Sequence, residues 1–243
     1  MIIHIPHASV SIPPECRAPF RQEKLPHEIA VMTDWYCDEL FAFDAPTLVF
    51  PVSRLVCDPE RFREDSEEIM STIGMGAVYT HGSDGTPLRN VTSIEREAIL
   101  RRFYDPHHAA LERLVQAELE RTGRALILDG HSFHATPLPY ETDAARPDFC
   151  IGTDGCHTPR PLAEALIGFF RECGFSVLEN APFAGCLVPL RYWQKDPRVH
   201  SVMIEVNRGL YLKNGTERSE RFDAVRTVLC GAMALLRSTE AAL

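Results

Sequence analysis

The most constraining feature of this sequence is an alternation of short, apolar, β-branched runs with longer segments of helical periodicity. The strand-like runs are Ile2–Ile5, Thr47–Val52, Ala125–Leu128, Asp148–Ile151, Ser176–Leu178 and Ser201–Val206. The helix-like segments are His27–Phe43, Thr92–Thr122, Pro161–Cys173 and Ser219–Arg237. This alternation predicts an α/β fold with a mixed, mainly parallel sheet flanked by helices on both faces.

Local signals support the longest helix and mark two irregular stretches. Thr92 or Ser93 is a suitable N-cap, and Gly123 is expected to end the same helix. Residues 63–90 hold many glycines, serines and charges but no periodic run, which predicts a long loop excursion of the kind that is usually functional or disordered. Residues 133–147 are also irregular. No repeat or domain boundary interrupts the chain, so we expect one domain over residues 1–243.

Composition excludes several classes of partner. A formal net charge of −9 argues against nucleic-acid binding, which needs a basic surface. Neither a secretory leader nor an apolar run of membrane length is visible, so we expect a cytoplasmic protein without a membrane partner. Cys57, Cys150 and Cys186 lie in or beside apolar runs and are expected to be reduced core residues. The spacing of Cys150, Cys156 and His157 does not match a zinc ribbon.

Four of the apolar runs lead into reactive side chains. Ile2–Ile5 is followed by His7, and Ala125–Leu128 by Asp129 and His131. Thr47–Val52 is followed by Arg54, Asp58 and Arg61. Ser201–Val206 contains Glu205 and is followed by Arg208. Ligands of open α/β sheets bind beyond the carboxyl ends of the strands. We therefore expect these side chains to meet at one edge of the sheet.

Two strand-end histidines predict a metal site. Either His7 or His131 alone is more simply a hydrogen-bonded loop histidine, but together with nearby carboxylates they favour a shared zinc or other divalent ion. A hydrolytic zinc usually has three protein ligands. The third is open between Asp34, which also fits a solvated helix face, and Asp58, which also fits an ion pair with nearby arginines.

Glu205 is the candidate catalytic base. Alternation along its strand sets it on the face opposite Val202 and Ile204, and burial without a partner raises the pKa of a carboxyl group toward the range useful for a base. The alternative is a structural ion pair with Arg208. Asp129 either orients a metal ligand or serves as a turn residue.

Three arginines are candidates for binding an anionic substrate in this acidic chain. Arg54, Arg61 and Arg208 each carry a planar fork of donors that matches a carboxylate, although any one of them could be purely structural.

Six segments, in matching order across nearly the whole chain, resemble those of N-formylglutamate amidohydrolases. They are His4-Ile5-Pro6-His7-Ala8-Ser9, Thr33-Asp34-Trp35-Tyr36-Cys37-Asp38-Glu39-Leu40-Phe41, Arg54-Leu55-Val56-Cys57-Asp58, Tyr104-Asp105-Pro106-His107-His108, Asp129-Gly130-His131-Ser132 and Glu205-Val206-Asn207-Arg208. Two departures concern the substrate: Glu60 stands where the family often has Asn, and Ala8-Ser9 where it usually has Ser-Gly.

The resemblance implies a fold like that of the zinc carboxypeptidases (the phosphorylase/hydrolase-like architecture), with a mixed sheet of about eight strands between helices. It implies hydrolysis of N-formyl-L-glutamate to formate and L-glutamate, late in histidine degradation. A related metallopeptidase or deacylase of other N-acyl amino acids is the alternative enzyme. The alternative without enzymatic activity is a member of the family that binds an acidic metabolite and does not turn it over. In each case the partner is a small anion.

The resemblance also implies roles for individual residues. His7 and His131 match metal-type histidines, and Asp34 matches a recurring helix aspartate, which favours it as third ligand. Glu205 matches the base of related carboxypeptidases. The other matches are Arg54 and Arg61, which lie near the substrate in the family, and His108, to which no role is attached.

Overall fold

The computed structural model describes residues 1–243. The strands are β1 (Ile2–Ile5), β2 (Thr47–Val49), β3 (Ala125–Phe133), β4 (Phe149–Gly152), β5 (Val177–Glu179), β6 (Val199–Asn207), β7 (Leu212–Lys213) and β8 (Glu217–Arg218). The α-helices are α1 (Pro14–Arg17), α2 (Leu25–Met32), α3 (Cys37–Leu40), α4 (Ser93–Ile99), α5 (Asp105–Thr122), α6 (Arg160–Glu172) and α7 (Phe222–Ala242). Two 3₁₀ turns (Ile69–Ile73 and Arg208–Leu210) and one π-helical turn (Leu100–Tyr104) complete the regular structure.

Six strands form one mixed sheet in the order β2-β1-β3-β6-β4-β5. All neighbouring pairs are parallel except β4 and β6, which are antiparallel. The predicted mainly parallel sheet is therefore confirmed, and its six strands arise from the six predicted runs. The expectation of about eight strands in this sheet was wrong, because β7 and β8 pair only with each other. The run predicted at Thr47–Val52 leaves the sheet after Val49, since Phe50 and Val52 are buried in a different cluster.

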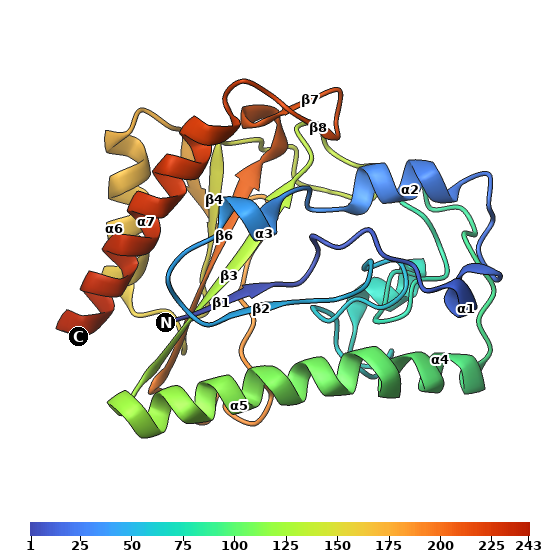
Figure 1. The fold of residues 1–243 in the computed structure, drawn as a ribbon, viewed down its shortest axis with the longest axis horizontal. Helices are drawn as coiled ribbons and strands as arrows, with labels where there is room; N and C mark the ends of the chain where they lie inside the picture. Colours follow the sequence, from blue (N-terminus) through green and yellow to red (C-terminus); the bar gives the residue numbers. More distant parts are fainter.

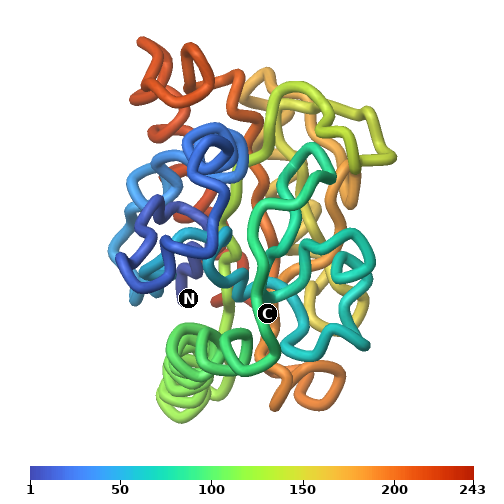
Figure 2. Tube along the Cα trace, turned by 90° about the vertical axis from the view of Figure 1, so that its right-hand side faces the viewer, coloured from blue at the N-terminus to red at the C-terminus, as the bar shows by residue number.

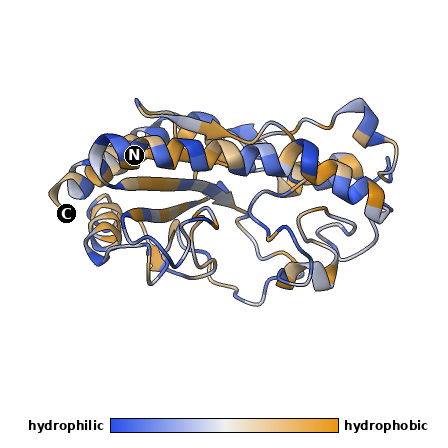
Figure 3. Cartoon of the chain, turned by 90° about the horizontal axis from the view of Figure 1, so that it is seen from below, coloured by the Kyte–Doolittle hydropathy of each residue, from blue (hydrophilic) through white to orange (hydrophobic).

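Helices cover both faces of the sheet (Figure 1). Alternation along β1 sends Ile3 and Ile5 into the core cluster shared with α6 and α7. On the opposite face, Ile2 packs with Leu111 and Val115 of α5. Figure 3 shows α5 with hydrophilic and hydrophobic residues alternating along its length, as expected for a helix with one face on a sheet.

The predicted helix Thr92–Thr122 is nearly continuous. Thr92 caps it, accepting a hydrogen bond from the backbone N–H of Glu95, whose carboxylate accepts one from the Thr92 N–H. A π-helical turn separates α4 from α5, and Gly123 ends the helix with a φ of 82°, a conformation that glycine adopts readily. The sequence signals at both ends were therefore correct.

The helix predicted over His27–Phe43 is broken, which is a correction. α2 ends at Met32 and α3 begins at Cys37. Between them the Asp34 N–H donates to the His7 carbonyl, and Tyr36 adopts a φ of 62°. Asp34 is only 2% exposed, so it does not lie on a solvated helix face. Helical periodicity does not reveal this break because the contacts that hold it come from distant parts of the chain.

The predicted loop excursion lies beyond the C-terminal end of β1, with α1 and α2 (Figures 1 and 2). Only the turn Ile69–Ile73 interrupts its irregular backbone. Its residues Tyr79 and Leu88 form a second hydrophobic cluster with Leu25 of α2 and Leu100 of the π-helical turn, among others. Separately, none of the helices has the length and apolar character needed to cross a bilayer.

Candidate active site

The functional side chains gather where the residues on one face of the sheet change from apolar to polar. Along β3, Ala125 and Ile127 pack on α5, but Asp129 and His131 follow on the same face. The adjacent strand continues this polar end, since Glu205 of β6 lies directly beside His131 in the register. A cavity of about 770 Å³ opens here, and its lining includes His7, Arg54, His131 and Glu205. The predicted convergence at one sheet edge is therefore present.

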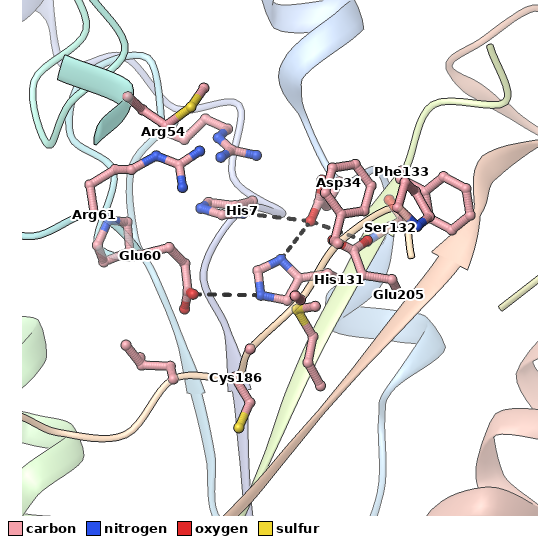
Figure 4. A pocket seen from close by; sticks show the side chains of 18 of the residues that line it. His7, Asp34, Arg54, Glu60, Arg61, His131, Ser132, Phe133, Cys186 and Glu205 are labelled. Carbon is pink, nitrogen blue, oxygen red and sulfur yellow. Dashed lines mark hydrogen bonds and ion pairs between the residues drawn. The ribbon is translucent and has the colours of Figure 1, made fainter. Parts of the chain in front are cut away.

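His7, Asp34 and His131 form a compact group (Figure 4). The Nδ1 atoms of His7 and His131 lie 3.7 and 3.3 Å from the same oxygen of Asp34, Oδ2. The imidazole centroids are 5.0 Å apart. All three side chains are buried, and Nδ1 of His7 has no hydrogen-bond partner.

A second carboxylate holds the outer nitrogen of each imidazole. Nε2 of His7 donates to Asp58 Oδ1 at 2.9 Å, and Nε2 of His131 donates to Asp129 Oδ1 at 3.1 Å. A carboxylate can only accept, so each Nε2 carries a proton, and each Nδ1 faces Asp34 and would offer its lone pair to an ion bound there. This pattern of carboxylate, histidine and metal is common around protein-bound zinc. Asp58 thus lies on the far side of His7, and Asp34 is the carboxylate between the rings.

The electrostatics of the group favour a cation between these three residues. Burial would raise the pKa of Asp34, but the facing imidazoles of His131 and His7 hold it well below its usual value. Burial would lower the pKa of His131, but the charge of Asp129 raises it well above its usual value. Two imidazoles and one carboxylate are a typical donor set for Zn²⁺. The unpartnered Nδ1 of His7 and this local preference for positive charge fit a divalent ion.

Glu205 lies beside this group without a salt-bridge partner. It is 8% exposed, and its Oε2 makes no hydrogen bond. Burial raises the pKa of Glu205 to about 7, although the charge of His131 opposes the shift. The alternative ion pair with Arg208 does not form.

The three candidate arginines differ in how many donors they have free. Arg54 donates through Nε and Nη2 to Asp58, whereas Arg61 approaches Asp58 only to 3.8 Å and its buried Nε has no partner. Arg208 donates from all three nitrogens: to Asp34 Oδ1 at 2.7 Å, to the hydroxyl and carbonyl oxygens of Ser132, and to the Val31 carbonyl. Free donors in the pocket therefore belong mainly to Arg61.

Sequence reasoning did not place three residues in the site, namely the buried His4 and His107 and the partly exposed Glu60. His4 donates through Nδ1 to Asp129, which leaves its Nε2 to accept a hydrogen bond from Nε2 of His107 at 2.8 Å. Glu60 lies 3.3 Å from Nδ1 of His4. Alternation along β1 could have revealed His4, because it occupies the same face as Asp129 of the paired strand.

The structure shows which contacts His108 and His157 make. His108 donates through Nε2 to the Pro59 carbonyl at 2.9 Å, which ties α5 to the segment between Asp58 and Arg61. His157 uses both ring nitrogens, with Nδ1 donating to the Val199 carbonyl and Nε2 accepting the Gln194 N–H. No ring nitrogen of His157 is left for a zinc ion, in keeping with the spacing argument.

Comparisons with known proteins agree with the resemblance in the sequence. A family model described as N-formylglutamate amidohydrolase matches residues 1–212. No curated protein gives a match. The chain is similar to a crystal structure of N-formylglutamate amidohydrolase from Ralstonia eutropha, with 23% identity, a TM-score of 0.82, and coverage of 99% of this chain and 92% of that chain. A gene product from Agrobacterium tumefaciens shares 19% identity with a TM-score of 0.66, covering 98% and 91%. At these identities the structures support the fold.

Proposed function

The chain belongs to the N-formylglutamate amidohydrolase family, and we propose from this premise that it is a metal-dependent hydrolase of N-formyl-L-glutamate or a close N-acyl amino acid. With N-formyl-L-glutamate the products are formate and L-glutamate. The observation that carries the proposal is the pair of Nδ1 atoms facing Asp34, with the unpartnered carboxylate of Glu205 beside them.

His7, Asp34 and His131 would hold the ion. A divalent cation bound there supplies a Lewis acid for the amide carbonyl and lowers the pKa of water. Asp58 and Asp129 keep the two rings in the tautomer and orientation that expose Nδ1. The metal site therefore rests on carboxylates outside it as well as on its three ligands.

Glu205 acts as the general base in this proposal. Its Oε2 is free to accept the proton of the attacking water and to return that proton to the leaving amine. A carboxyl group whose pKa lies near 7 can do both at neutral pH. Its place beside His131 on the adjacent strand would bring it next to an amide bound at the ion.

Arg54 and Arg61 bind the substrate carboxylates. Arg61 has a free, buried Nε, and the fork of a guanidinium matches a carboxylate in two parallel hydrogen bonds. Asp58 holds Arg54 in place through two of its nitrogens. Binding both carboxylates fixes the amide relative to Glu205, which removes much of the entropic cost of reaction.

Arg208 is better suited to positioning than to substrate binding. The sequence made it a candidate for the substrate, but its nitrogens already donate to Asp34, Ser132 and Val31. We propose that it fixes the orientation of Asp34 and offsets its charge.

Metal content and activity of one variant test this function. The purified chain should hold about one zinc or similar ion per chain and hydrolyse N-formyl-L-glutamate. His131→Ala should lose both the metal and the activity, whereas His27→Ala, at an exposed position outside the pocket, should keep both. Full metal content in His131→Ala would show that His131 is not a ligand.

A further inference from the structure

The cavity is larger than N-formylglutamate requires. Its volume of about 770 Å³ lies in the upper part of the range of about 300–1,000 Å³ found for drug-sized ligands. The dozen non-hydrogen atoms of N-formylglutamate would occupy no more than about 360 Å³, even at the ~30 Å³ that each molecule takes in liquid water. More than half of the cavity would remain for a further part of a substrate.

The cavity has a polar part and an apolar part. Arg54 and Arg61 lie together on one side of His7 and His131, and Cys186 lies on another side (Figure 4). The segment that contains Cys186 contributes mostly apolar side chains to the lining. We call four of the lining residues the apolar wall: Phe62, Leu187, Leu190 and Trp193.

The apolar wall is partly open to solvent. The rings of Phe62 and Trp193 meet edge to face with centroids 6.1 Å apart, so Phe62 turns its ring toward Trp193. Leu190 is 47% exposed, and Ile69, another residue of the cavity lining, is 80% exposed. Large apolar side chains gathered in one accessible cavity usually mark a binding surface for an apolar group.

The apolar wall is attached to the catalytic group rather than being a loose loop. The Leu187 N–H donates to Asp129 Oδ2 at 3.0 Å, and the other oxygen of Asp129 holds His131. The Leu187 carbonyl accepts a hydrogen bond from the Ser201 hydroxyl of β6 at 2.8 Å. The backbone of the wall is therefore fixed at Leu187 relative to the proposed reaction centre.

We propose that the substrate is an N-acyl dicarboxylic amino acid whose acyl group is an apolar chain of several carbons or an aryl group. The amino-acid carboxylates bind Arg54 and Arg61, and the acyl group lies against the apolar wall. A formyl group has no methyl or methylene to bury there. This inference rests on the proposed hydrolase function and deepens it by naming the substrate class.

A series of substrates of equal chemical reactivity tests the acyl group. N-acetyl-, N-butanoyl- and N-hexanoyl-L-glutamate differ only in methylene groups, each of which contributes about 0.8 kcal/mol when buried, or about fourfold in kcat/KM. We expect kcat/KM to rise by at least about tenfold from acetyl to hexanoyl, since part of the chain stays near solvent. The Kd of the same series for Glu205→Gln, measured by calorimetry, should fall in parallel.

Two variants connect the effect to the apolar wall. Leu190→Ala removes a half-exposed side chain and should flatten the dependence of kcat/KM on chain length without harming the fold. Trp193→Ala should flatten it further. Leu178→Ala is the matched control, because Leu178 is also exposed but lies on β5 outside the cavity. This variant should show the same dependence of kcat/KM on chain length as the parent.

The outcomes separate this inference from the proposed function. A flat or falling series from acetyl to hexanoyl, with N-formyl-L-glutamate hydrolysed, overturns the inference and leaves the function standing. Faster hydrolysis of N-formyl-L-phenylalanine than of N-formyl-L-glutamate also overturns it, because the apolar group would then belong to the amine side. No hydrolysis of any member, the formyl compound included, refutes the proposed function itself.

Discussion

Replacing Arg208 by Met should damage the fold and the metal site rather than substrate binding. Met has a similar length but no charge, so Asp34, at 2% exposure, would lose its cationic partner. Breaking a buried ion pair on one side costs about 3–5 kcal/mol. That is a large part of the roughly 5–15 kcal/mol by which domains are usually stable.

Urea unfolding of metal-stripped protein measures this loss. Arg226→Met, at an exposed position of α7 without a hydrogen bond, is the matched control and should change the free energy of unfolding by no more than about 0.5 kcal/mol. In a double-mutant cycle, Arg208→Met with Asp34→Asn should cost clearly less than the two single changes added together.

Metal affinity and KM distinguish positioning from substrate binding. In Arg208→Met the Kd for zinc should rise by about 10–100-fold, as for other groups that orient metal ligands. KM of the metal-saturated variant should change little. A variant as stable as the parent, with unchanged metal affinity and a raised KM, would refute this reasoning and restore Arg208 as a substrate-binding residue.

Two further predictions concern Arg61 and His108. Arg61→Ala should keep the metal and raise KM by about 10–150-fold, because a charge-assisted hydrogen bond contributes about 1.5–3 kcal/mol; steady-state kinetics with unchanged KM would exclude it from binding. Burial lowers the pKa of His108 to about 4, below its unfolded value, so its contribution to stability is complete above that unfolded value and is lost as pH falls toward 4. The free energy of unfolding of the parent should therefore fall by about 2 kcal/mol more between pH 7 and pH 5 than that of His108→Gln, which keeps a donor for the Pro59 carbonyl. Equal decreases of the two free energies, measured by urea unfolding, would contradict this.

The sheet could be predicted from the sequence because its strands carry their own signal. Runs such as Ile2–Ile5 and Ala125–Leu128 are buried on both faces, and burial on both faces favours apolar residues at nearly every position, with His4 as the exception. The placement of His131 and Glu205 follows from this, since adjacent parallel strands bring their ends to the same edge.

The break after Met32 and the roles of the arginines could not be predicted. Asp34 leaves the helix because its backbone bonds to His7 and its carboxylate bonds to Arg208, both distant in the sequence. Likewise, Arg61 and Arg208 look alike in the sequence, and only the tertiary contacts show which guanidinium keeps free donors. Local patterns specify elements, whereas these assignments depend on long-range hydrogen bonds.

The most direct test of the central claim is the turnover of Glu205→Gln. Glutamine keeps the size of the side chain but cannot accept the proton of water, so kcat should fall by about 10²–10⁴. Metal content and KM should stay near those of the parent, and Glu217→Gln, exposed on β8, should be as active as the parent. A kcat for Glu205→Gln equal to that of the parent would contradict the account, because the unpartnered carboxylate beside His131 would then have no part in catalysis.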